Sequence, residues 1–289
     1  ASNYNLMQSY NQTQERNEVI GMKKRIILIA VFGILLLILP LMAGAEIIES
    51  GKCGVLDWSF DSDNVLTISG NGLIPNMDFN KAPWANYQDN IETLIIKEGV
   101  VRIGENATYR MLNLKKVSFP STMTNIGPHN FEDCYQLSKV ELPSSLTELG
   151  VWCFSGCNSL TTIHIPASLS NIGYSSFTHN LSLTSITVDK ANPKYHAEDG
   201  VLLSDTELLC YPIGNTRSKY IIPEGIEVIK QGAFAECKYL SSIIFPDSLN
   251  RIEMSILYNC SGMTSIVLPH NLQAIWGNAF LGTSITEIN

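Results

Sequence analysis

The sequence predicts a repeat solenoid, because one pattern of apolar residues and proline returns at a fixed spacing along most of its 289 residues. An apolar residue followed by Pro recurs every 23 residues, and the same frame resumes after one longer gap. The pairs that carry this frame are Phe119-Pro120, Leu142-Pro143, Ile165-Pro166, Ile222-Pro223, Phe245-Pro246 and Leu268-Pro269. A fixed period of about 20 to 50 residues is the signature of stacked units that contact only their neighbours.

Each unit contains one short strand and a turn-rich return segment. In the unit that ends at Pro166, Ile163 and Ile165 alternate with polar residues, which predicts a strand with both side chains facing the core. Proline ends the strand because it cannot donate to the next hydrogen-bond ladder. One strand per unit, preceded by Leu160, is typical of a leucine-rich repeat, in which a parallel β-sheet alternates with short convex turns or helices.

The return segment supplies the other side of the predicted core. Phe154 and Cys157 have equivalents in other units and are expected to fill the convex side. A glycine follows an apolar residue in several units, as at Leu149-Gly150. We expect this glycine to permit a turn conformation that residues with a Cβ resist.

These residues resemble the BspA-like leucine-rich repeats of secreted and surface proteins from bacteria and some protists. The motif Ile-Gly-x-x-x-Phe-x-x-Cys-x-x-Leu-x-x-Ile-x-Ile-Pro carries the resemblance over about residues 51–289. The resemblance implies a β-rich N-terminal module at 46–90 and a solenoid of 23-residue units at 91–289. The spacing from Asp189 to Pro223 is 34 residues, so we expect a hairpin insertion at 190–219 that projects from one unit. The ninth unit stops within its strand, which predicts a truncated C-terminus or a longer natural protein.

The N-terminal segment at 22–45 has the features of a secretory signal peptide. A cluster of three cations, Lys23 to Arg25, precedes an uncharged stretch that ends in Ala43-Gly44-Ala45. We expect cleavage after Ala45, with retention as a membrane anchor as the alternative, since the stretch is long enough to span a bilayer. Residues 1–21 are then an upstream remnant or a misassigned start, with Met22 as the initiator.

The composition excludes wholesale disorder and argues against a nucleic-acid partner. Hydrophobic residues make up 45% of the chain and charged residues only 16%. The 19 basic and 27 acidic residues give a net charge of −8, and removal of residues 1–45 would leave 15 basic and 25 acidic residues. A basic face that neutralises phosphates is therefore not expected. Membrane contact is expected only through an uncleaved signal segment.

The sequence contains no recognisable catalytic, cofactor or metal motif. A nucleophile elbow, a zincin helix, a phosphate loop and a dinucleotide fingerprint are all missing, so we expect neither an enzyme nor a bound cofactor. Cysteines at equivalent positions, such as Cys134 and Cys157, are expected to be core thiols rather than a disulfide or metal ligands. Asp57, Asp61 and Asp63 resemble the start of a calcium loop, but a solvated hairpin turn is favoured because no Glu follows at the required place.

The most informative surface is the outward face of the predicted sheet. In each strand the residue two positions before the Pro position should point to the concave side. The predicted partner-binding residues are Ser118, Glu141, His164, Thr187, Ile221, Ile244 and Val267. The alternatives are that these are ordinary solvent-facing residues, and that the apolar three serve strand propensity or lie under the insertion.

Together these features predict a secreted or surface-exposed binding or adhesion module. Its concave sheet would recognise a protein or glycan, and the family resemblance implies attachment to a host or neighbouring cell. Two alternatives remain open at this stage: a self-associating structural surface protein without a dedicated ligand, and an envelope hydrolase.

Overall fold

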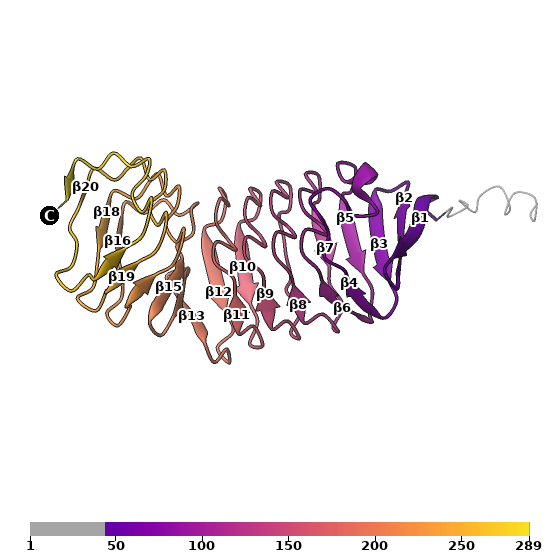
Figure 1. The fold of residues 1–289 in the computed structure, drawn as a ribbon, viewed down its shortest axis with the longest axis horizontal. Coiled ribbons are helices and arrows are strands. Elements are labelled where there is room, and N and C mark those ends of the chain that lie inside the picture. Colours follow the sequence, from indigo (N-terminus) through magenta and orange to yellow (C-terminus); the bar gives the residue numbers. More distant parts are fainter. Residues whose placement is uncertain (1–43, 289) are drawn as a thin grey trace, which may run out of the picture. The chain divides into compact units, whose positions relative to one another are not determined.

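Short strands, most of them parallel to their neighbours, are stacked one beside the next from Ile47 onward (Figure 1). The computed structural model describes residues 44–288, so the predicted segments 1–21 and 22–45 lie outside the described residues except for Gly44 and Ala45. Across the described range no helix has the length and hydropathy needed to cross a bilayer. The fold is a β-solenoid of about nine turns with almost no helix, which confirms the predicted fold class.

An antiparallel meander begins the structure and merges with the repeats. It consists of β1 (Ile47–Cys53), β2 (Leu56–Asp61) and β3 (Val65–Ser69). Strand β3 pairs in parallel with β5 (Thr93–Ile96), and β4 (Gly72–Ile74) pairs in parallel with β6 (Val100–Ile103). The short 3-10 helix η1 (Ala85–Tyr87) lies between β4 and β5. Strand β3 of the meander and the separate strand β4 therefore each begin a parallel ladder of the solenoid.

The predicted strands form what we call the first strand row. Its members are β5, β7 (Lys116–Ser118), β10 (Thr162–Ile165), β12 (Ser185–Val188), β16 (Lys219–Ile221), β18 (Ser242–Ile244), β20 (Ser265–Ile266) and β22 (Glu287–Ile288). Pairing follows the 23-residue frame, with Ile163 opposite Ile186 and Ile221 opposite Ile244. At Lys139 the row narrows to a single isolated bridge with Lys116.

A second strand row, which the sequence analysis did not predict, runs along the other side of each turn. It contains β4, β6, β8 (Asn125–Ile126), β9 (Glu148–Leu149) and β11 (Asn171–Ile172), and then β17 (Val228–Ile229), β19 (Arg251–Ile252) and β21 (Ala274–Ile275). Each unit thus has two strands. Most members of this row are only two residues long, so no alternation of apolar and polar residues marks them.

The glycine that follows β6, β8, β9 and β11 serves close packing, and the predicted role in a turn conformation is wrong. Gly150 does not have a positive φ, and its N–H donates to the Ile126 carbonyl across 2.8 Å. A Cβ at Gly150 would lie 2.2 Å from the Pro128 nitrogen of the preceding turn. Gly127 and Gly173 face the backbone of the preceding turn in the same way. Glycine is needed because two backbones meet where a side chain has no room.

Phenylalanine rings form the central part of the core. The Phe131 and Phe154 rings stack with centroids 5.0 Å apart and planes inclined by 6°, and Phe177 continues the stack 6.3 Å from Phe154. All three side chains are buried. The seven cysteines are also buried and free, and the Cys157 thiol donates to the Phe131 carbonyl across 3.2 Å. The core position predicted for Phe and Cys is where the structure places them.

The convex side consists of turns, without helices, in the described repeats. Its backbone has positive φ at pairs of positions four residues apart, as at Trp152 (58°) and Gly156 (75°). A residue in the left-handed region interrupts the repeating right-handed geometry that a helix requires. The short convex segments therefore remain turns.

The 190–219 insertion contains a hairpin but does not project from the solenoid as expected. Strands β13 (Tyr195–Glu198) and β14 (Val201–Ser204) form the antiparallel hairpin, and β15 (Glu207–Cys210) returns to pair in parallel with β17. All of β14 is buried, since its Leu202 packs with the units before the insertion and its Leu203 with those after it. Burial of apolar side chains on both sides of β14 keeps the insertion inside the stack.

Candidate functional site

The seven predicted partner-binding residues are all exposed. Five of them lie in strands of the first strand row, whereas Glu141 follows the bridge residue Lys139 and Val267 directly follows β20. We call this set, Ser118, Glu141, His164, Thr187, Ile221, Ile244 and Val267, the outward row. Buried residues alternate with them, as with Ile163 and Ile165 on either side of His164. The His164 ring nitrogen Nδ1 lies 3.0 Å from the Thr187 hydroxyl on the adjacent strand. Alternation along each strand therefore presents side chains to solvent at equivalent positions of successive units.

The three apolar members of the outward row are open to solvent. Ile221 is 60% exposed, Ile244 43% and Val267 65%. The alternative that the insertion covers them is wrong, because its middle strand is buried within the stack and pairs toward the second strand row. Three aliphatic side chains on consecutive units of a solvated sheet form an apolar patch of the kind that often marks a contact surface.

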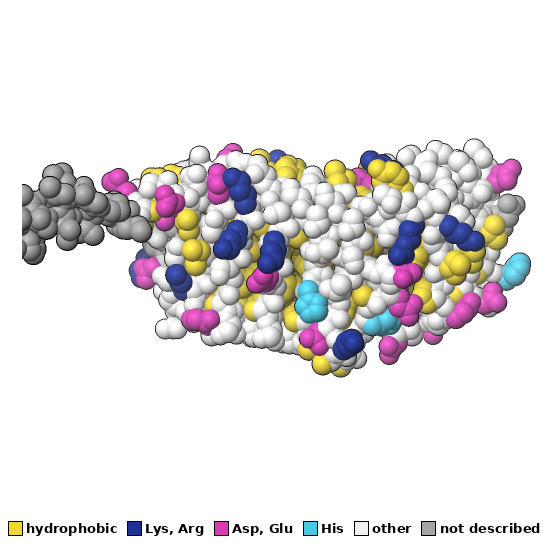
Figure 2. All heavy atoms as spheres, turned by 180° about the vertical axis from the view of Figure 1, so that it is seen from behind, with side chains coloured by type: hydrophobic (Ala, Val, Ile, Leu, Met, Phe, Trp, Pro, Cys, Tyr) yellow, Lys and Arg dark blue, Asp and Glu magenta, His cyan; other side chains and the backbone are white. Residues whose placement is uncertain are grey.

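The N-terminal part of the row is charged rather than apolar. Lys139 and Glu141 form an ion pair of 2.6 Å within one segment, and both side chains are more than three-quarters exposed. The Lys139 hydrogen bond holds the pKa of the Glu141 carboxyl below its ordinary value. Figure 2 shows dark-blue side chains close together over the N-terminal half of one face, amid a surface that is largely white. The uncharged surface agrees with the low charged fraction of the chain.

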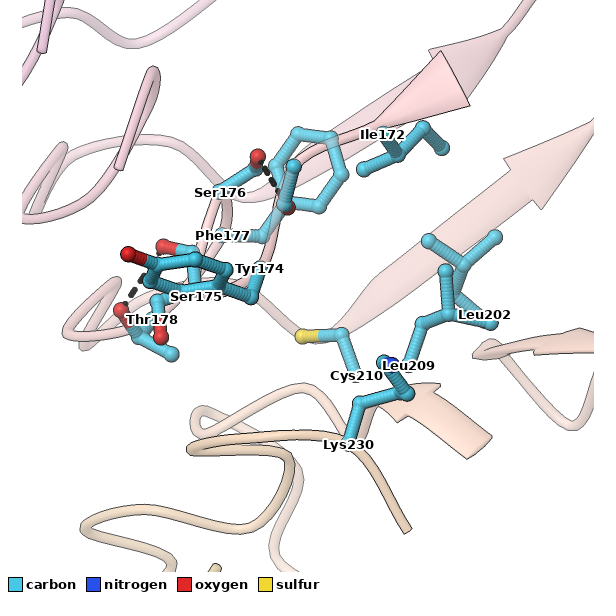
Figure 3. A pocket seen from close by; sticks show the side chains of 11 residues that line it. Ile172, Tyr174, Ser175, Ser176, Phe177, Thr178, Leu202, Leu209, Cys210 and Lys230 are labelled. Carbon is cyan, nitrogen blue, oxygen red and sulfur yellow. Dashed lines mark hydrogen bonds between the residues drawn. The ribbon is translucent and has the colours of Figure 1, made fainter. Parts of the chain in front are cut away.

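A small cavity lies where the insertion interrupts the second strand row (Figure 3). Cys210 directs its sulfur toward the loop of Ser175, and Ile172 and Leu202 line the other side. The volume of about 30 Å³ accommodates water but not an organic ligand, which needs a pocket of about 300 Å³ or more. Burial raises the pKa of the Cys210 thiol to about 12, so the thiol stays protonated at neutral pH. This cavity is a packing feature.

Residues 44–288 contain no group of three or more His, Cys, Asp or Glu side chains placed to hold a metal ion. Asp61, one of the aspartates weighed as a calcium ligand, accepts hydrogen bonds from the N–H groups of Asp63 and Val65, each 3.0 Å long. Its carboxylate therefore closes the turn between β2 and β3, as the favoured alternative proposed.

The comparison with protein families decides the identity of the repeats. The family described as BspA type leucine rich repeat region matches residues 84–196 and 214–289, in six copies. The chain belongs to this family. The BspA-type match stops at the insertion and resumes after it, in agreement with the interruption that the structure shows. No curated protein matches the chain.

Solved structures of bacterial repeat proteins share the BspA-type fold of this chain. A leucine-rich repeat protein from Eubacterium ventriosum is 21% identical with a TM-score of 0.57, covering 82% of this chain and 95% of the other. The pneumococcal vaccine antigen PcpA is 17% identical with a TM-score of 0.56, over 84% and 82%. A leucine-rich repeat protein from Bacteroides ovatus is 19% identical with a TM-score of 0.51, over 83% and 76%. Identities this low establish a common fold alone.

On the convex side of this BspA-type solenoid, an ion pair joins the units before and after the insertion. His179 Nδ1 lies 3.2 Å from Glu236 Oε2, and both side chains are about one-third exposed. The Trp152 ring stacks on the His179 ring at 6.0 Å. The His179 side chain is therefore partly buried, although it belongs to a turn on the surface. His179 and Glu236 are 57 positions apart, which is not a multiple of the 23-residue period because the insertion lies between them. The repeat pattern in the sequence therefore does not relate the two residues.

We expect the His179–Glu236 pair to make stability depend on pH. The hydrogen bond to Glu236 raises the pKa of His179, and the same bond lowers the pKa of Glu236. The contribution of His179 is fully present below its unfolded pKa of about 6.5 and is lost as pH rises through the higher folded value. The contribution of Glu236 is present above its unfolded pKa of about 4.3 and is lost as pH falls through the lower folded value. The pair therefore stabilises most between about pH 4.5 and 6.5.

The variant His179→Gln tests this pH dependence in urea unfolding experiments. The variant should be less stable than the unmodified protein by about 0.5 kcal/mol near pH 5.5, which is the size expected of a partly exposed ion pair. The difference in stability should be smaller near pH 8.5. His196→Gln serves as the control, because His196 makes no ion pair in the described part of the chain. A stability difference for His179→Gln that is the same at both pH values would contradict the ion-pair assignment.

Proposed function

We propose that this protein is an exported BspA-type repeat protein that binds a macromolecule on a host or neighbouring cell through its outward row. The observation that carries the proposal is the exposed aliphatic set Ile221, Ile244 and Val267 on consecutive units, with Ile221 and Ile244 opposite each other in paired strands. Exposed β-branched side chains held on a sheet lose little further conformational freedom on binding. The partner is a protein or a glycan.

Secretion or surface display is part of the same proposal. It is supported by the signal-like sequence at 22–45 and by membership in a family whose solved structural relatives include a pneumococcal vaccine antigen. We infer that the protein acts by binding and not by catalysis. In the described outward row the His164 ring contacts the Thr187 hydroxyl, but the Glu141 carboxylate pairs with Lys139 and does not orient the histidine, as the base of an envelope hydrolase would need.

The triple variant Ile221→Ser, Ile244→Ser and Val267→Ser tests the binding surface. The fold should be almost unchanged, because exposed positions shift stability by about 0.5 kcal/mol or less each. Affinity for a partner that covers the patch should fall by about tenfold or more, since burial of several exposed methyl groups is lost. The matched control is Val55→Ser, Leu73→Ser and Leu181→Ser, three exposed apolar residues outside the outward row.

The experiment begins with an unbiased pull-down that uses the 289-residue chain as bait, followed by affinity measurements with both triple variants. Loss of affinity in the outward-row variant alone supports the proposal. Equal affinity of both variants for the captured partner contradicts it. Light scattering tests self-association. If oligomers form with rising protein concentration in the absence of any captured partner, and the outward-row substitutions reduce them, self-association is established as the function instead.

A further inference from the structure

Two lysines face each other where the first strand row is reduced to an isolated bridge. Lys116 and Lys139 are opposite one another in the isolated bridge, and both are exposed. Like charges directly opposite each other on neighbouring strands are destabilising. The chain carries a net charge of −8, so its composition gives no reason to expect two lysines side by side. Their juxtaposition requires a local explanation.

The acidic groups nearby do not fully compensate these lysines. Lys115 pairs with Glu92 at 2.7 Å, and Lys139 pairs with Glu141 at 2.6 Å. In the described part of the chain Lys116 has no carboxylate within ion-pair distance, although its charge contributes to lowering the pKa of Glu141. Two ammonium groups therefore share the Glu141 carboxylate. One positive charge is left for a further carboxylate to neutralise.

The lysines line a hollow of ligand size. Its volume is about 580 Å³, and its walls include the Ser118 and Ser138 side chains beside Lys116 and Lys139. Ammonium and hydroxyl groups are donors that suit a carboxylate. The hollow lies at the interruption of the first strand row, and Ser118 belongs to the outward row. The cationic hollow and the apolar patch therefore both lie along the first strand row, with His164 and Thr187 in the units between them.

The combination favours a protein partner over a glycan. Ile221, Ile244 and Val267 offer only methyl and methylene groups, and sugar hydroxyls placed against them would lose hydrogen bonds with water. None of the seven outward-row residues is Trp, Tyr or Phe, and the one ring in the row, the His164 imidazole, lies against the Thr187 hydroxyl. A polypeptide can present a carboxylate and aliphatic side chains on one segment.

We propose that the outward face binds an acidic segment of a partner protein, with a carboxylate over Lys116 and Lys139 and aliphatic side chains over Ile221, Ile244 and Val267. This inference rests on the proposed function, because it assigns the chemical class of the partner to the same face. The free ammonium of Lys116 completes its ion pairing only when the segment is bound. The bound carboxylate also relieves the repulsion between the two lysines.

The test uses the 289-residue chain and three polymer probes. They are a random copolymer of L-glutamate and L-leucine, poly-L-glutamate, and alginate, which carries carboxylates on a polysaccharide. The copolymer should bind most tightly. The variant Lys116→Glu with Lys139→Glu should weaken copolymer binding by about tenfold, and the loss should shrink as salt rises from about 30 to 300 mM. The matched control is Lys81→Glu with Lys190→Glu, an equal charge change at exposed lysines outside the outward face.

The outcomes separate this inference from the proposed function. Equal loss in both lysine variants would show a bulk charge effect and overturn the inference, as would tighter binding of alginate than of the copolymer. If the serine triple variant loses the captured natural partner while the lysine variant keeps it, the outward-row function stands and the acidic-segment proposal fails. If circular dichroism shows that Lys→Glu prevents folding, the Lys116→Gln and Lys139→Gln pair is measured instead, with a smaller loss in the same direction.

Discussion

Replacement of Phe154 by Ala is expected to lower the free energy of unfolding by about 3–5 kcal/mol. Phe154 is fully buried between Phe131 and Phe177, and its ring stacks on both. Truncation removes the apolar contacts of the ring and leaves a cavity that the stacked neighbours cannot fill, since their own turns are fixed by the ladders on either side. Because each unit contacts only its neighbours, the loss should reach the units on both sides.

Chemical denaturation monitored by circular dichroism measures this loss, and hydrogen exchange locates it. Protection should fall in the turns that contain Phe131 and Phe177 as well as in that of Phe154. Tyr239→Ala is the control, because Tyr239 is 48% exposed and its removal should cost about 0.5 kcal/mol or less. A denaturation midpoint for Phe154→Ala equal to that of the unmodified protein would exclude a central role for the aromatic stack.

The second large effect is expected from Gly150→Ala, a change of one methyl group. The added Cβ would lie 2.2 Å from the Pro128 nitrogen and 2.4 Å from the Gly127 carbonyl carbon. Both contacts are with backbone, so the turns must move apart and weaken the bond between the Gly150 N–H and the Ile126 carbonyl. We expect a loss of about 3 kcal/mol, at the upper end of the cost of overpacking.

Gly277→Ala is the matched control for this prediction. A Cβ at Gly277 meets nothing within 4 Å, and its backbone does not have a positive φ. This variant should therefore be neutral or slightly more stable, because Ala restricts the unfolded chain more than Gly does. Equal thermal unfolding of the two variants would mean that the turns at Gly150 and Gly127 can separate without cost.

The 23-residue frame was accessible from sequence because proline and alternating aliphatic residues mark each first-row strand. Ile163 and Ile165 point inward and His164 points outward, which follows from the two-residue period of a strand. The Phe stack was accessible for the same reason, since equivalent positions in adjacent units must lie side by side. Exposure of the outward row then followed from the frame without any knowledge of distant contacts.

Other features depend on contacts between units and carry no local signal. The second strand row consists mainly of two-residue strands, and the role of Gly150 is visible only when the backbone at Pro128 is placed against it. The insertion combines apolar runs that the sequence analysis interpreted as a projecting hairpin. Burial of β14 from both sides required the cores before and after it to be in place.

The sequence by itself determined the repeat length, the first strand row and the residues that this row presents to solvent, because these follow from local periodicity. Only the tertiary structure decided that each unit has two strands, that the insertion lies inside the stack, and that Lys116 is left without a close carboxylate. These outcomes depend on which backbones and charges from different turns come within a few ångströms of each other. Stacking sets those distances, and stacking is a property of the assembled solenoid rather than of any one unit.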